Sequence, residues 1–516
     1  MATPSDKLAS SLAELRALQA GGRRVFESDD ISRVHRERLL RQGFLRSVIK
    51  GWYIATGLGA ATGDSTLWYA SFWEFCARYC ESRFGKDWHL SPEQSLLLHA
   101  ENTVIPTQVV VCSPKGTNNT VALPFGTSLY DLKQKQGPPT ADLTMKDDLR
   151  IFAPAAALTR VSEDFFARHP VETQVTLASI KDSSEVLSRL LEGGHSSVAG
   201  RVAGAFRRIG RNNFADEIVK TMKGAGYDVR ESDPFAARQV FRPLSQGTAP
   251  IVGRIRALWA SLRDAAMEGF PQAPGLPKDT TAYLSLVDEI YRNDAYHSLS
   301  IEGYRVTPEL IEKVGAGDWN PNASESDRQN RDALGARGYW QAFQEVKEAV
   351  AKIIAGNDPG AVVRLAHRDW YRELFAPSVA AGLIGAAYLA GYRSGPVFLR
   401  GSRHVPPRAE VLGDAMPALF DLLEGESEPS VRAVLGHWLF GYIHPYPDGN
   451  GRMARFLMNA MLASGGYPWT VIRVEDRDAY LEALESASIG GDVRPFAAFI
   501  AERVRWSIDR AARPAA

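Results

Sequence analysis

Cysteine is scarce in this chain of 516 residues, which has only Cys76, Cys80 and Cys112. An odd and sparse set of cysteines excludes a disulfide framework, and no second pair is present to complete a zinc site. We expect buried free thiols. A reducing, cytoplasmic location fits this cysteine usage best.

Net charge is also absent, because 60 Lys and Arg residues balance 60 Asp and Glu residues. No global field therefore draws the molecule to nucleic acid or to an anionic membrane, so any such partner must meet a local patch. Long apolar runs are missing as well. The longest, residues 379–390, has about twelve residues including two glycines, short of the ~20 that span a bilayer. We expect it to form a buried helix, and we expect no membrane partner.

The length predicts about three domains, at roughly 150 residues per domain. Pro, Gly and polar residues concentrate in residues 241–250 and 270–277, so a boundary is expected near residue 245. Upstream of it, the apolar runs Thr107–Cys112 and Val121–Leu123 suggest two strands joined by a turn. After residue 280 the apolar spacing is helical almost throughout. The sequence thus predicts a multi-domain chain with an α+β N-terminal half and an all-α C-terminal domain.

The segment HPYPDGNGRMAR, residues 444–455, separates two helical patterns. Pro445 disfavours the α conformation at His444, so the preceding helix should end there and present the imidazole as a candidate base. Residues 449–451 allow positive φ angles, which let successive amide N–H groups converge on an anion. This nest opens the next helix, whose N-terminus also favours negative charge. A phosphate is the natural occupant.

Two cations and a carboxylate complete this segment. Arg452 and Arg455 are three residues apart and hence neighbours on one helix face, where their guanidinium forks can grip phosphate oxygens. Asp448 is a lone carboxylate beside the anion site, which is typical of Mg²⁺ bound together with phosphates. A lone histidine at a helix end, or a lone Gly-Asn turn, is usually only structural. The whole string instead predicts transfer of a phosphate-containing group from a nucleotide to a hydroxyl.

The segment resembles the signature of Fic domains, usually His-Pro-Phe-x-Asp/Glu-Gly-Asn-Gly-Arg-x-x-Arg. Tyr446 replaces Phe as the one departure, and we expect its ring to pack into the core while its hydroxyl finds a partner. The resemblance covers roughly residues 280–505. It implies an all-helical fold and the transfer of AMP from ATP to a protein hydroxyl, with Mg²⁺. The implied roles are a base at His444, a Mg²⁺ ligand at Asp448, an anion hole at Gly449, Asn450 and Gly451, and triphosphate binding by Arg452 and Arg455.

A second match to this family is the segment GYRSGPVFLRGSRHVPP, residues 391–407. It looks like the Fic flap, a β-hairpin that holds the backbone of the protein target by strand addition, so that the target's Ser, Thr or Tyr hydroxyl faces the nucleotide. An ordinary edge hairpin is the alternative for the segment taken alone. Its position upstream of the signature favours the flap.

A third match is SLSIEG, in which Ser298, Glu302 and Gly303 fit the family's inhibitory pattern Ser/Thr-x-x-x-Glu-Gly/Asn. Ser298 and Glu302 are i and i+4, so both face one way on the expected inhibitory helix near residues 298–303. A carboxylate aimed at Arg455 would occupy the fork that the γ-phosphate needs. The alternative is a solvated helix face.

Positive charge gathers in residues 31–50, where six basic side chains oppose only Glu37. The pattern predicts a helix beginning at Asp29 or Asp30, followed by a two-stranded wing that turns at residues 50–51. This winged helix-turn-helix resembles the DNA-binding front of abortive-infection-type antitoxins. Its candidate contacts to double-stranded DNA are Arg33, Arg36, Arg38 and Arg41. A solvated helix face or a protein-docking wing is the alternative.

Three regions are therefore expected: a winged-helix region over residues 1–95, an α+β middle domain resembling the same antitoxins over 96–245, and a Fic domain over 250–516. The expected function is that of a cytoplasmic adenylyltransferase restrained in cis by Glu302. Two alternatives stay open. One is a DNA-binding transcriptional regulator whose Fic domain only senses nucleotide, and the other is an enzyme that mainly removes AMP from proteins. A homodimer also stays open.

Overall fold

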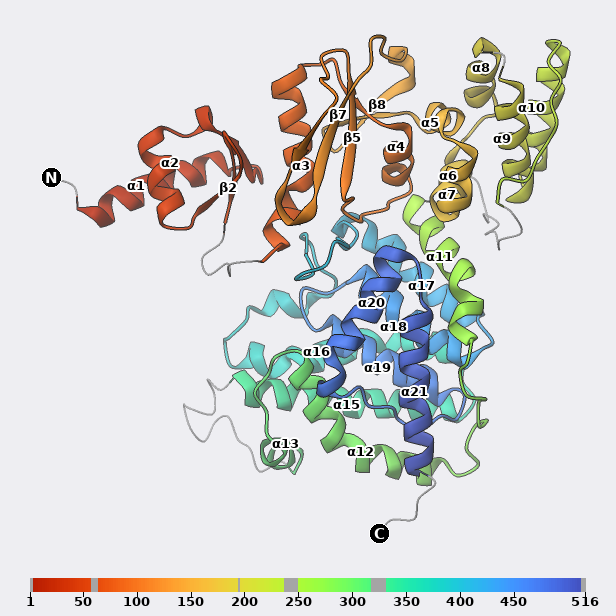
Figure 1. Ribbon diagram of the computed structural model, residues 1–516. Helices are drawn as coiled ribbons and strands as arrows, with labels where there is room; N and C mark the ends of the chain where they lie inside the picture. Colours follow the sequence, from red (N-terminus) through yellow and green to blue (C-terminus); the bar gives the residue numbers. More distant parts are fainter. Residues whose placement is uncertain (1–2, 57–63, 194, 236–248, 317–330, 512–516) are drawn as a thin grey trace. The chain divides into compact units, whose positions relative to one another are not determined.

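The computed structural model describes residues 3–56, 64–193, 195–235, 249–316 and 331–511. The chain divides into two compact units (Figure 1). The first contains Met1–Pro250 together with Phe398–Val405, and the second contains Ile251–Val397 and Pro406–Ala516. The boundary expected near residue 245 and most of its linker lie outside the described residues.

The first unit begins with a helix, a strand, a helix and a hairpin, which are α1 (Pro4–Leu18), β1 (Val25–Glu27), α2 (Arg33–Arg41), β2 (Leu45–Ile49) and β3 (Trp52–Ala55). The three strands form an antiparallel sheet in the order β1-β3-β2. The predicted hairpin turn forms at residues 50–51, with Gly51 at a φ of 86°. The helix begins later than expected because Ser28–Asp30 form a 3-10 turn. The assignment of a DNA-binding winged helix stays a prediction.

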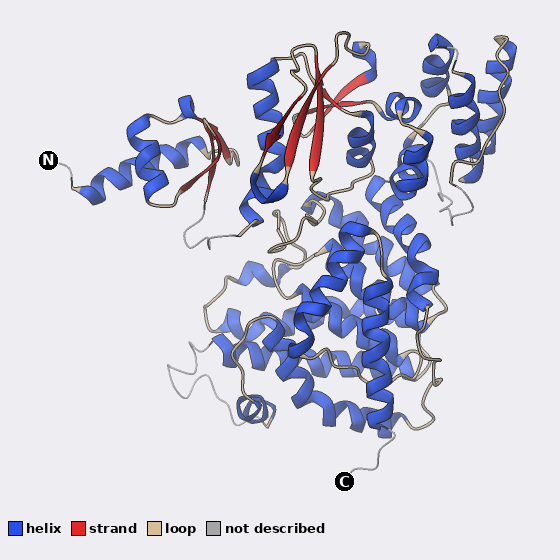
Figure 2. Cartoon of the chain, viewed as in Figure 1, coloured by secondary structure: helices blue, strands red, loops and turns tan. Residues whose placement is uncertain are grey.

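A second sheet follows (Figure 2). The elements of this part are α3 (Thr66–Phe84), β4 (His89–Leu90), α4 (Pro92–His99), β5 (Gln108–Ser113), β6 (Asn119–Ala122), β7 (Ser128–Lys133), β8 (Leu143–Lys146) and β9 (Leu149–Phe152). The four-stranded sheet has the order β4-β5-β7-β6, with β5 and β7 parallel, and β8 and β9 form a hairpin. One buried cluster joins Val25 and Trp52 of the first sheet to α3 and to Val109 of β5. The position expected for a boundary, residue 95, therefore does not separate two cores.

Helices complete the first unit: α5 (Pro154–Arg160), α6 (Glu163–Arg168), α7 (Pro170–Ser179), α8 (Ser184–Gly193), α9 (Ser196–Arg208) and α10 (Asn212–Gly224). They share an apolar core that includes Phe166, Leu177 and Phe206. All three cysteines of the chain lie in the first unit as buried free thiols, as the sequence predicts. The mixed α+β character expected for the N-terminal half is confirmed.

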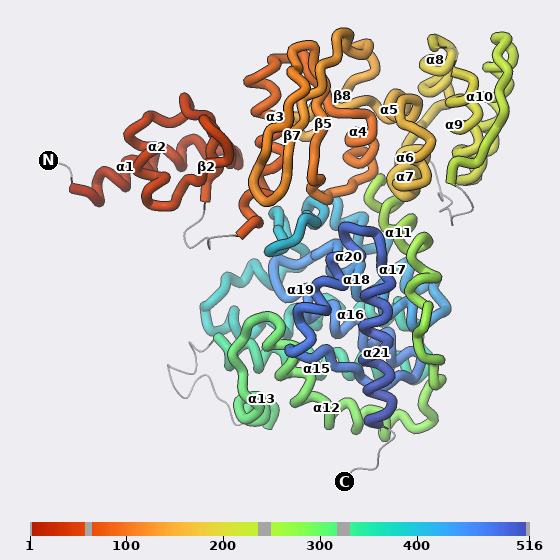
Figure 3. The backbone as a smooth tube through the Cα atoms, in the orientation of Figure 1, coloured from red at the N-terminus to blue at the C-terminus, as the bar shows by residue number. Residues whose placement is uncertain are grey.

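The described residues of the second unit form helices and no strands (Figure 2). These helices are α11 (Pro250–Met267), α12 (Thr280–Ile301), α13 (Pro308–Gly315), α15 (Arg331–Ile354), α16 (Pro359–Ala380), α17 (Leu412–Gly425), α18 (Pro429–Ile443), α19 (Asn450–Ala463), α20 (Arg477–Gly490) and α21 (Arg494–Ala511). Helices α18 and α19 pack against each other (Figure 3). Both are buried along nearly their whole length. The all-α prediction for this region is confirmed.

Two expectations differ from the structure between residues 379 and 407. The apolar run 379–390 is not a buried helix, because α16 ends at Ala380 and Gly382 takes a φ of 73°, after which only a short 3-10 turn forms over Ala386–Ala390. Residues 391–407 lack the paired strands of the expected hairpin, since Gly and Pro interrupt the segment. Their one β-bridge joins His404 to Val104 within the first unit. No described helix is long and apolar enough to cross a membrane.

Candidate active site

The site is built around the turn between α18 and α19. Helix α18 ends at Ile443, and His444 caps it with a left-handed backbone, φ 52° and ψ 60°. This conformation costs free energy in a residue other than glycine. It persists only where the surrounding structure holds it, and it often marks a functional position. The expectation that Pro445 ends the helix at His444 is borne out in the backbone.

The imidazole of His444 is oriented by the helix that precedes it. Its Nδ1 lies 3.2 Å from the carbonyl oxygen of Gly441. A carbonyl can only accept, so Nδ1 carries the proton and Nε2 keeps its lone pair. Burial lowers the pKa of His444 to about 4, although the Gly441 carbonyl opposes that shift. The ring is therefore neutral at neutral pH, which an unperturbed value of about 6.5 would only partly achieve.

Asn450 closes the turn by bonding twice to the backbone of Tyr446. The Asn450 Oδ1 accepts from the Tyr446 amide at 2.9 Å, and its Nδ2 donates to the Tyr446 carbonyl at 2.8 Å. The Asn450 side chain is buried. Its side chain thus holds the loop in shape, while the anion hole expected there depends on backbone N–H groups.

The ring of Tyr446 packs into the core as the sequence predicts, but its hydroxyl lacks the expected hydrogen-bond partner among the described residues. The ring is fully buried and stacks on Tyr371, with ring centroids 3.8 Å apart. Its hydroxyl has no hydrogen-bond partner among the described residues, contrary to expectation. The apolar ring alone therefore accounts for the packing.

Tyr446→Phe should accordingly leave stability unchanged or raise it. A buried hydroxyl without a partner costs about 1 to 3 kcal/mol, so its removal is expected to raise the free energy of unfolding by about 1 kcal/mol in denaturant titrations. Tyr283→Phe is the matched control, because the Tyr283 hydroxyl donates to the Tyr467 carbonyl at 2.6 Å and its loss should destabilise. Equal destabilisation by the two variants would show that Tyr446 has a partner.

The anion-binding geometry lies at the start of α19. Gly449 has a φ of 78° and is the N-cap of this helix, so the first amide groups of α19 have no helical partner upstream. A Cβ on Gly451 would lie 2.2 Å from Glu302 Oε1. The carboxylate of Glu302 therefore rests against the backbone of Gly451, where an anion is favoured.

Arg452 is oriented by aromatic rings. Its side chain is buried, and its guanidinium lies 5.1 Å from the ring centroids of both Tyr304 and Phe375. Such cation–π contacts help to fix the plane of the guanidinium. Its NH2 group is 3.8 Å from Asp448 Oδ1.

Arg455 contacts Glu302, as the sequence predicts, and also Ser298, which the sequence did not predict as its partner. Its Nε donates to Ser298 Oγ at 2.8 Å, and its NH2 donates to Glu302 Oε1 at 2.7 Å. Glu302 is the C-cap of α12, one residue after the helix ends. Burial opposes ionisation of Glu302, but the guanidiniums of Arg455 and Arg452 hold its pKa below the usual value. The structure thus places a charged Glu302 on the fork of Arg455.

Asp448 is the one carboxylate of the loop, and its side chain is 51% exposed. Its Oδ1 accepts the Gly449 amide N–H at 2.6 Å, so that N–H is not free for an anion. The described residues contain no cluster of three or more His, Cys, Asp or Glu able to hold a metal by themselves. A single accessible carboxylate suits Mg²⁺, which takes one or two carboxylates and completes its shell with water and phosphate oxygens.

Arg393 is a site residue that the sequence did not single out. Its backbone N–H donates to the Pro445 carbonyl at 2.9 Å, and its Nε donates to the His444 carbonyl at 2.8 Å. The same guanidinium donates to the Pro407 carbonyl. Arg393, about fifty residues upstream, thereby holds the backbone of His444 in place. The only signal in the sequence was the presence of an arginine in the segment GYRSG, residues 391–395.

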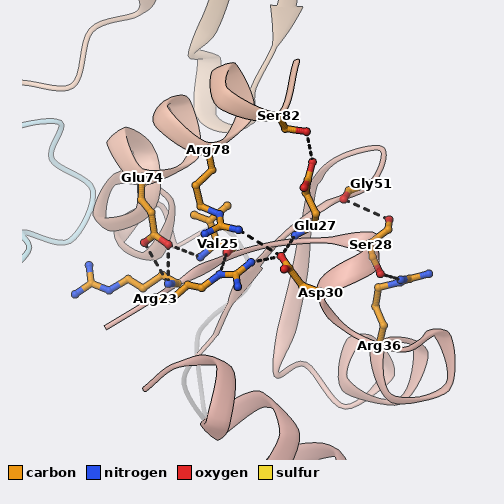
Figure 4. A network of polar contacts seen from close by, with 11 residues as sticks. Arg23, Val25, Glu27, Ser28, Asp30, Arg36, Gly51, Glu74, Arg78 and Ser82 are labelled. Carbon is orange, nitrogen blue, oxygen red and sulfur yellow. Dashed lines mark hydrogen bonds and ion pairs between the residues drawn. The ribbon is translucent and has the colours of Figure 1, made fainter. Parts of the chain in front are cut away.

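The proposed DNA-contact residues occupy different environments. Figure 4 shows that Arg36 turns back toward Ser28, whose carbonyl it binds, and it also donates to the Ile31 carbonyl at 3.1 Å. In the same network Asp30 pairs with both Arg23 and Arg78. Arg36 thus stabilises the turn before α2.

The other three arginines of α2 also differ. Arg38 donates to the Lys7 carbonyl at 2.8 Å and to Ser11 Oγ at 2.6 Å, so it ties α2 to α1. Arg33 is largely exposed beside Glu37, and Arg41 is exposed. Arg33 and Arg41 are therefore the residues of this set best placed to meet phosphate.

Known proteins resemble the region of the chain that contains this turn. Residues 363–462 match the model of the Fic/DOC family. A protein of Nematostella vectensis named Protein adenylyltransferase Fic is 47% identical over 122 residues, 23% of this chain and 28% of that protein. Protein adenylyltransferase fic-1 of Caenorhabditis elegans is 35% identical over 112 residues, 21% of this chain and 22% of that protein.

The chain thus matches about a quarter of the length of these curated relatives. Among solved structures, the match to Fic-1 (aa134 - 508) from C. elegans covers 66% of this chain and 86% of the chain in that structure, with a TM-score of 0.37 and 18% identity. The matched residues contain α18, the turn with His444 and α19. The C-terminal part of this chain contains a domain of the Fic/DOC family.

Proposed function

We propose that this chain transfers AMP from ATP to a hydroxyl side chain of a protein target. The observation that carries the proposal is the turn between α18 and α19, where a neutral imidazole, an accessible carboxylate, a helix N-terminus and two buried arginines meet. The relatives that match this region are named protein adenylyltransferases.

His444 acts on the target. Its Nε2 lone pair accepts the proton of the target Ser, Thr or Tyr hydroxyl as the oxygen attacks the α-phosphate of ATP. The bond between the α- and β-phosphates breaks, and pyrophosphate leaves. The Gly441 carbonyl keeps the ring in the required tautomer, and Arg393 holds the backbone that carries it.

The phosphates are bound by the start of α19. Backbone N–H groups of residues 450 and 451 would bind the anion, since the Gly449 N–H already donates to Asp448, while Arg452 and Arg455 supply the positive charge. Asp448 would hold Mg²⁺, which neutralises phosphate charge when bound. Glu302 competes with the γ-phosphate for Arg455, so the enzyme is restrained in cis.

A labelling experiment separates this enzyme from a nucleotide sensor. The purified chain is incubated with Mg²⁺ and ATP carrying a fluorescent adenine, then denatured and resolved on a gel. Transfer predicts adenine label that stays on the chain or on a partner after denaturation. A regulator that only senses nucleotide would bind ATP and lose all label on denaturation.

The protonation of His444 gives a pH prediction. Because its folded pKa is about 4, the imidazole is neutral above that value and gains a proton only below it. In nucleotide-free protein, the NMR signal of His444, assigned by its loss in His444→Ala, should not titrate between pH 5.5 and 8. A midpoint near 6.5 would mean that the ring is not desolvated as we describe.

Removal of AMP is a second direction for the same site. Glu302 pairs with Arg455, and its negative charge also opposes the lowering of the pKa of His444. A carboxylate there can position a water for attack on the phosphodiester. AMP-modified protein incubated with the wild-type chain would lose its label in that case, and the Glu302→Gly variant would not remove it.

DNA binding by the first unit is a separate proposal, supported by the exposed cations of α2. Arg33→Ala and Arg41→Ala should each weaken binding to double-stranded DNA and lower the log–log salt slope by about 0.9 per lost phosphate contact. Arg168→Ala, an exposed arginine on α6, is the control and should have no effect. Absence of DNA binding by the full chain at low salt would contradict the proposal.

A further inference from the structure

Helix α12 ends in a turn that fixes the direction of Glu302. Glu302 is the C-cap of the helix, and Gly303 follows it with a φ of 83°. The N–H of Gly303 donates to the Ser300 carbonyl at 3.0 Å, and the N–H of Tyr304 donates to the Leu299 carbonyl at 3.1 Å. These two bonds across a left-handed glycine form a Schellman motif, which closes a helix end. The backbone of Tyr304 is therefore fixed relative to that of Glu302.

The ring of Tyr304 is held by α15 and by Arg452. Its centroid lies 5.1 Å from the guanidinium carbon of Arg452 and 5.2 Å from that of Arg331, at the start of α15. Gly335, on the same face of α15 as Arg331, lets the ring approach closely. The three atoms nearest to a Cβ added at Gly335 all belong to the Tyr304 ring, and the Cβ would overlap them. The ring thus anchors the turn after α12.

The carboxylate of Glu302 depends on this turn for its position. Among the described residues it accepts one hydrogen bond, from Arg455 NH2 at 2.7 Å. A carboxylate held at one point keeps its place only while the backbone that carries it stays in place. Helix ends are the parts of a fold that open most easily, unless side chains pack them against their neighbours. At the end of α12, the packing is supplied by Tyr304.

We propose that Tyr304 is a positioning residue that keeps Glu302 in its inhibitory place. The proposal rests on the proposed function, in which Glu302 competes with the γ-phosphate for Arg455. For the carboxylate to leave Arg455, the last turn of α12 loosens, and the contacts of the Tyr304 ring oppose this loosening. Without the ring the turn opens more often, and Arg455 is free for a larger share of the time.

The test is the rate of AMP transfer by ring variants. Tyr304→Ala should raise it about fivefold, the worth of the lost cation–π contacts, and Tyr304→Phe should leave it unchanged because the ring is kept. In a Glu302→Gly background, Tyr304→Ala should bring no gain, since the inhibitor is already absent. A general loss of stability would not depend on Glu302 in this way. A gain that persists without Glu302, or no gain in its presence, would overturn the proposal.

Gly335→Ala reaches the same ring from α15. Its methyl group displaces the Tyr304 ring while alanine favours the helix, so it should also raise transfer. Added to Tyr304→Ala it should bring no further gain, because the two changes act on one contact. Gly413→Ala on α17 is the matched control, since a Cβ there meets no atom within 4 Å, and it should change nothing. Fully additive gains, or no gain from Gly335→Ala, would contradict the anchor.

Hydrogen exchange of the full chain separates this proposal from the proposed function. The amides of Gly303 and Tyr304 should exchange about fivefold faster in Tyr304→Ala and in Gly335→Ala, in proportion to the more frequent opening of the turn. In Tyr304→Phe they should exchange at the parental rate. If no variant transfers AMP, Glu302→Gly included, the proposed function fails and the exchange rates decide the anchor. Unchanged rates in both alanine variants would overturn it.

Discussion

Replacing His444 with alanine is expected to lower AMP transfer by about 10²- to 10⁴-fold, the usual cost of losing a general base. The ring acts on the proton of the target hydroxyl, so ATP affinity should stay near that of the parent. Transfer is measured in a Glu302→Gly background, where the signal is large, and nucleotide affinity is measured by calorimetry on the same samples.

His195→Ala is the matched control, because His195 is an exposed imidazole at the N-terminus of α9 in the first unit. It should label at the parental rate. If His444→Ala labelled as fast as its parent, the base would be another group and the assignment of Nε2 would be wrong. A loss of ATP affinity equal to the loss of rate would instead place His444 in nucleotide binding.

Replacing Glu302 with glycine should raise transfer at least tenfold. The carboxylate lies 2.7 Å from Arg455 NH2 and next to the backbone of Gly451. It therefore pairs with the guanidinium, and lies at the helix N-terminus, to which the phosphates of ATP must bind. A hydrogen bond to a charged group is worth about 1.5 to 3 kcal/mol, equivalent to a ten- to hundredfold shift in the population that binds ATP productively. The initial rate of label incorporation measures the effect.

Two further variants make this prediction specific. Arg455→Ala added to Glu302→Gly should cancel the gain, because the released fork is what grips the γ-phosphate. Glu309→Gly removes an exposed carboxylate from the first turn of α13 and should change nothing. A folded Glu302→Gly protein whose rate is unchanged or lower would show that Glu302 does not inhibit.

The part of the site that the sequence predicts is the part encoded locally. Pro445 forces the end of α18, and Gly449 begins α19, so the backbone at His444 and the nest follow from neighbouring residues. Spacing alone predicts that Ser298 and Glu302 face one way, and the Fic resemblance supplied Arg455 as the partner of Glu302. The structure brings these residues together as expected.

The parts that escaped prediction depend on contacts between distant segments. Arg393 reaches the site from a separate segment, and no spacing rule connects it to residues 444–455. In the middle sheet the two predicted strands form as β5 and β6, but β7 lies between them and pairs in parallel with β5, an arrangement that the local pattern does not show. Helix periodicity likewise could not show that Arg36 binds the carbonyls of residues 28 and 31.

The most direct test of the account is which phosphate of ATP stays with the protein. Glu302→Gly is incubated with Mg²⁺ and with ATP labelled at either the α- or the γ-phosphate, then denatured and analysed for covalent label. Transfer of AMP predicts label from the α-phosphate and none from the γ-phosphate, with the α-label abolished by His444→Ala. Label from the γ-phosphate, or none from either, would contradict the claim that this chain is a protein adenylyltransferase.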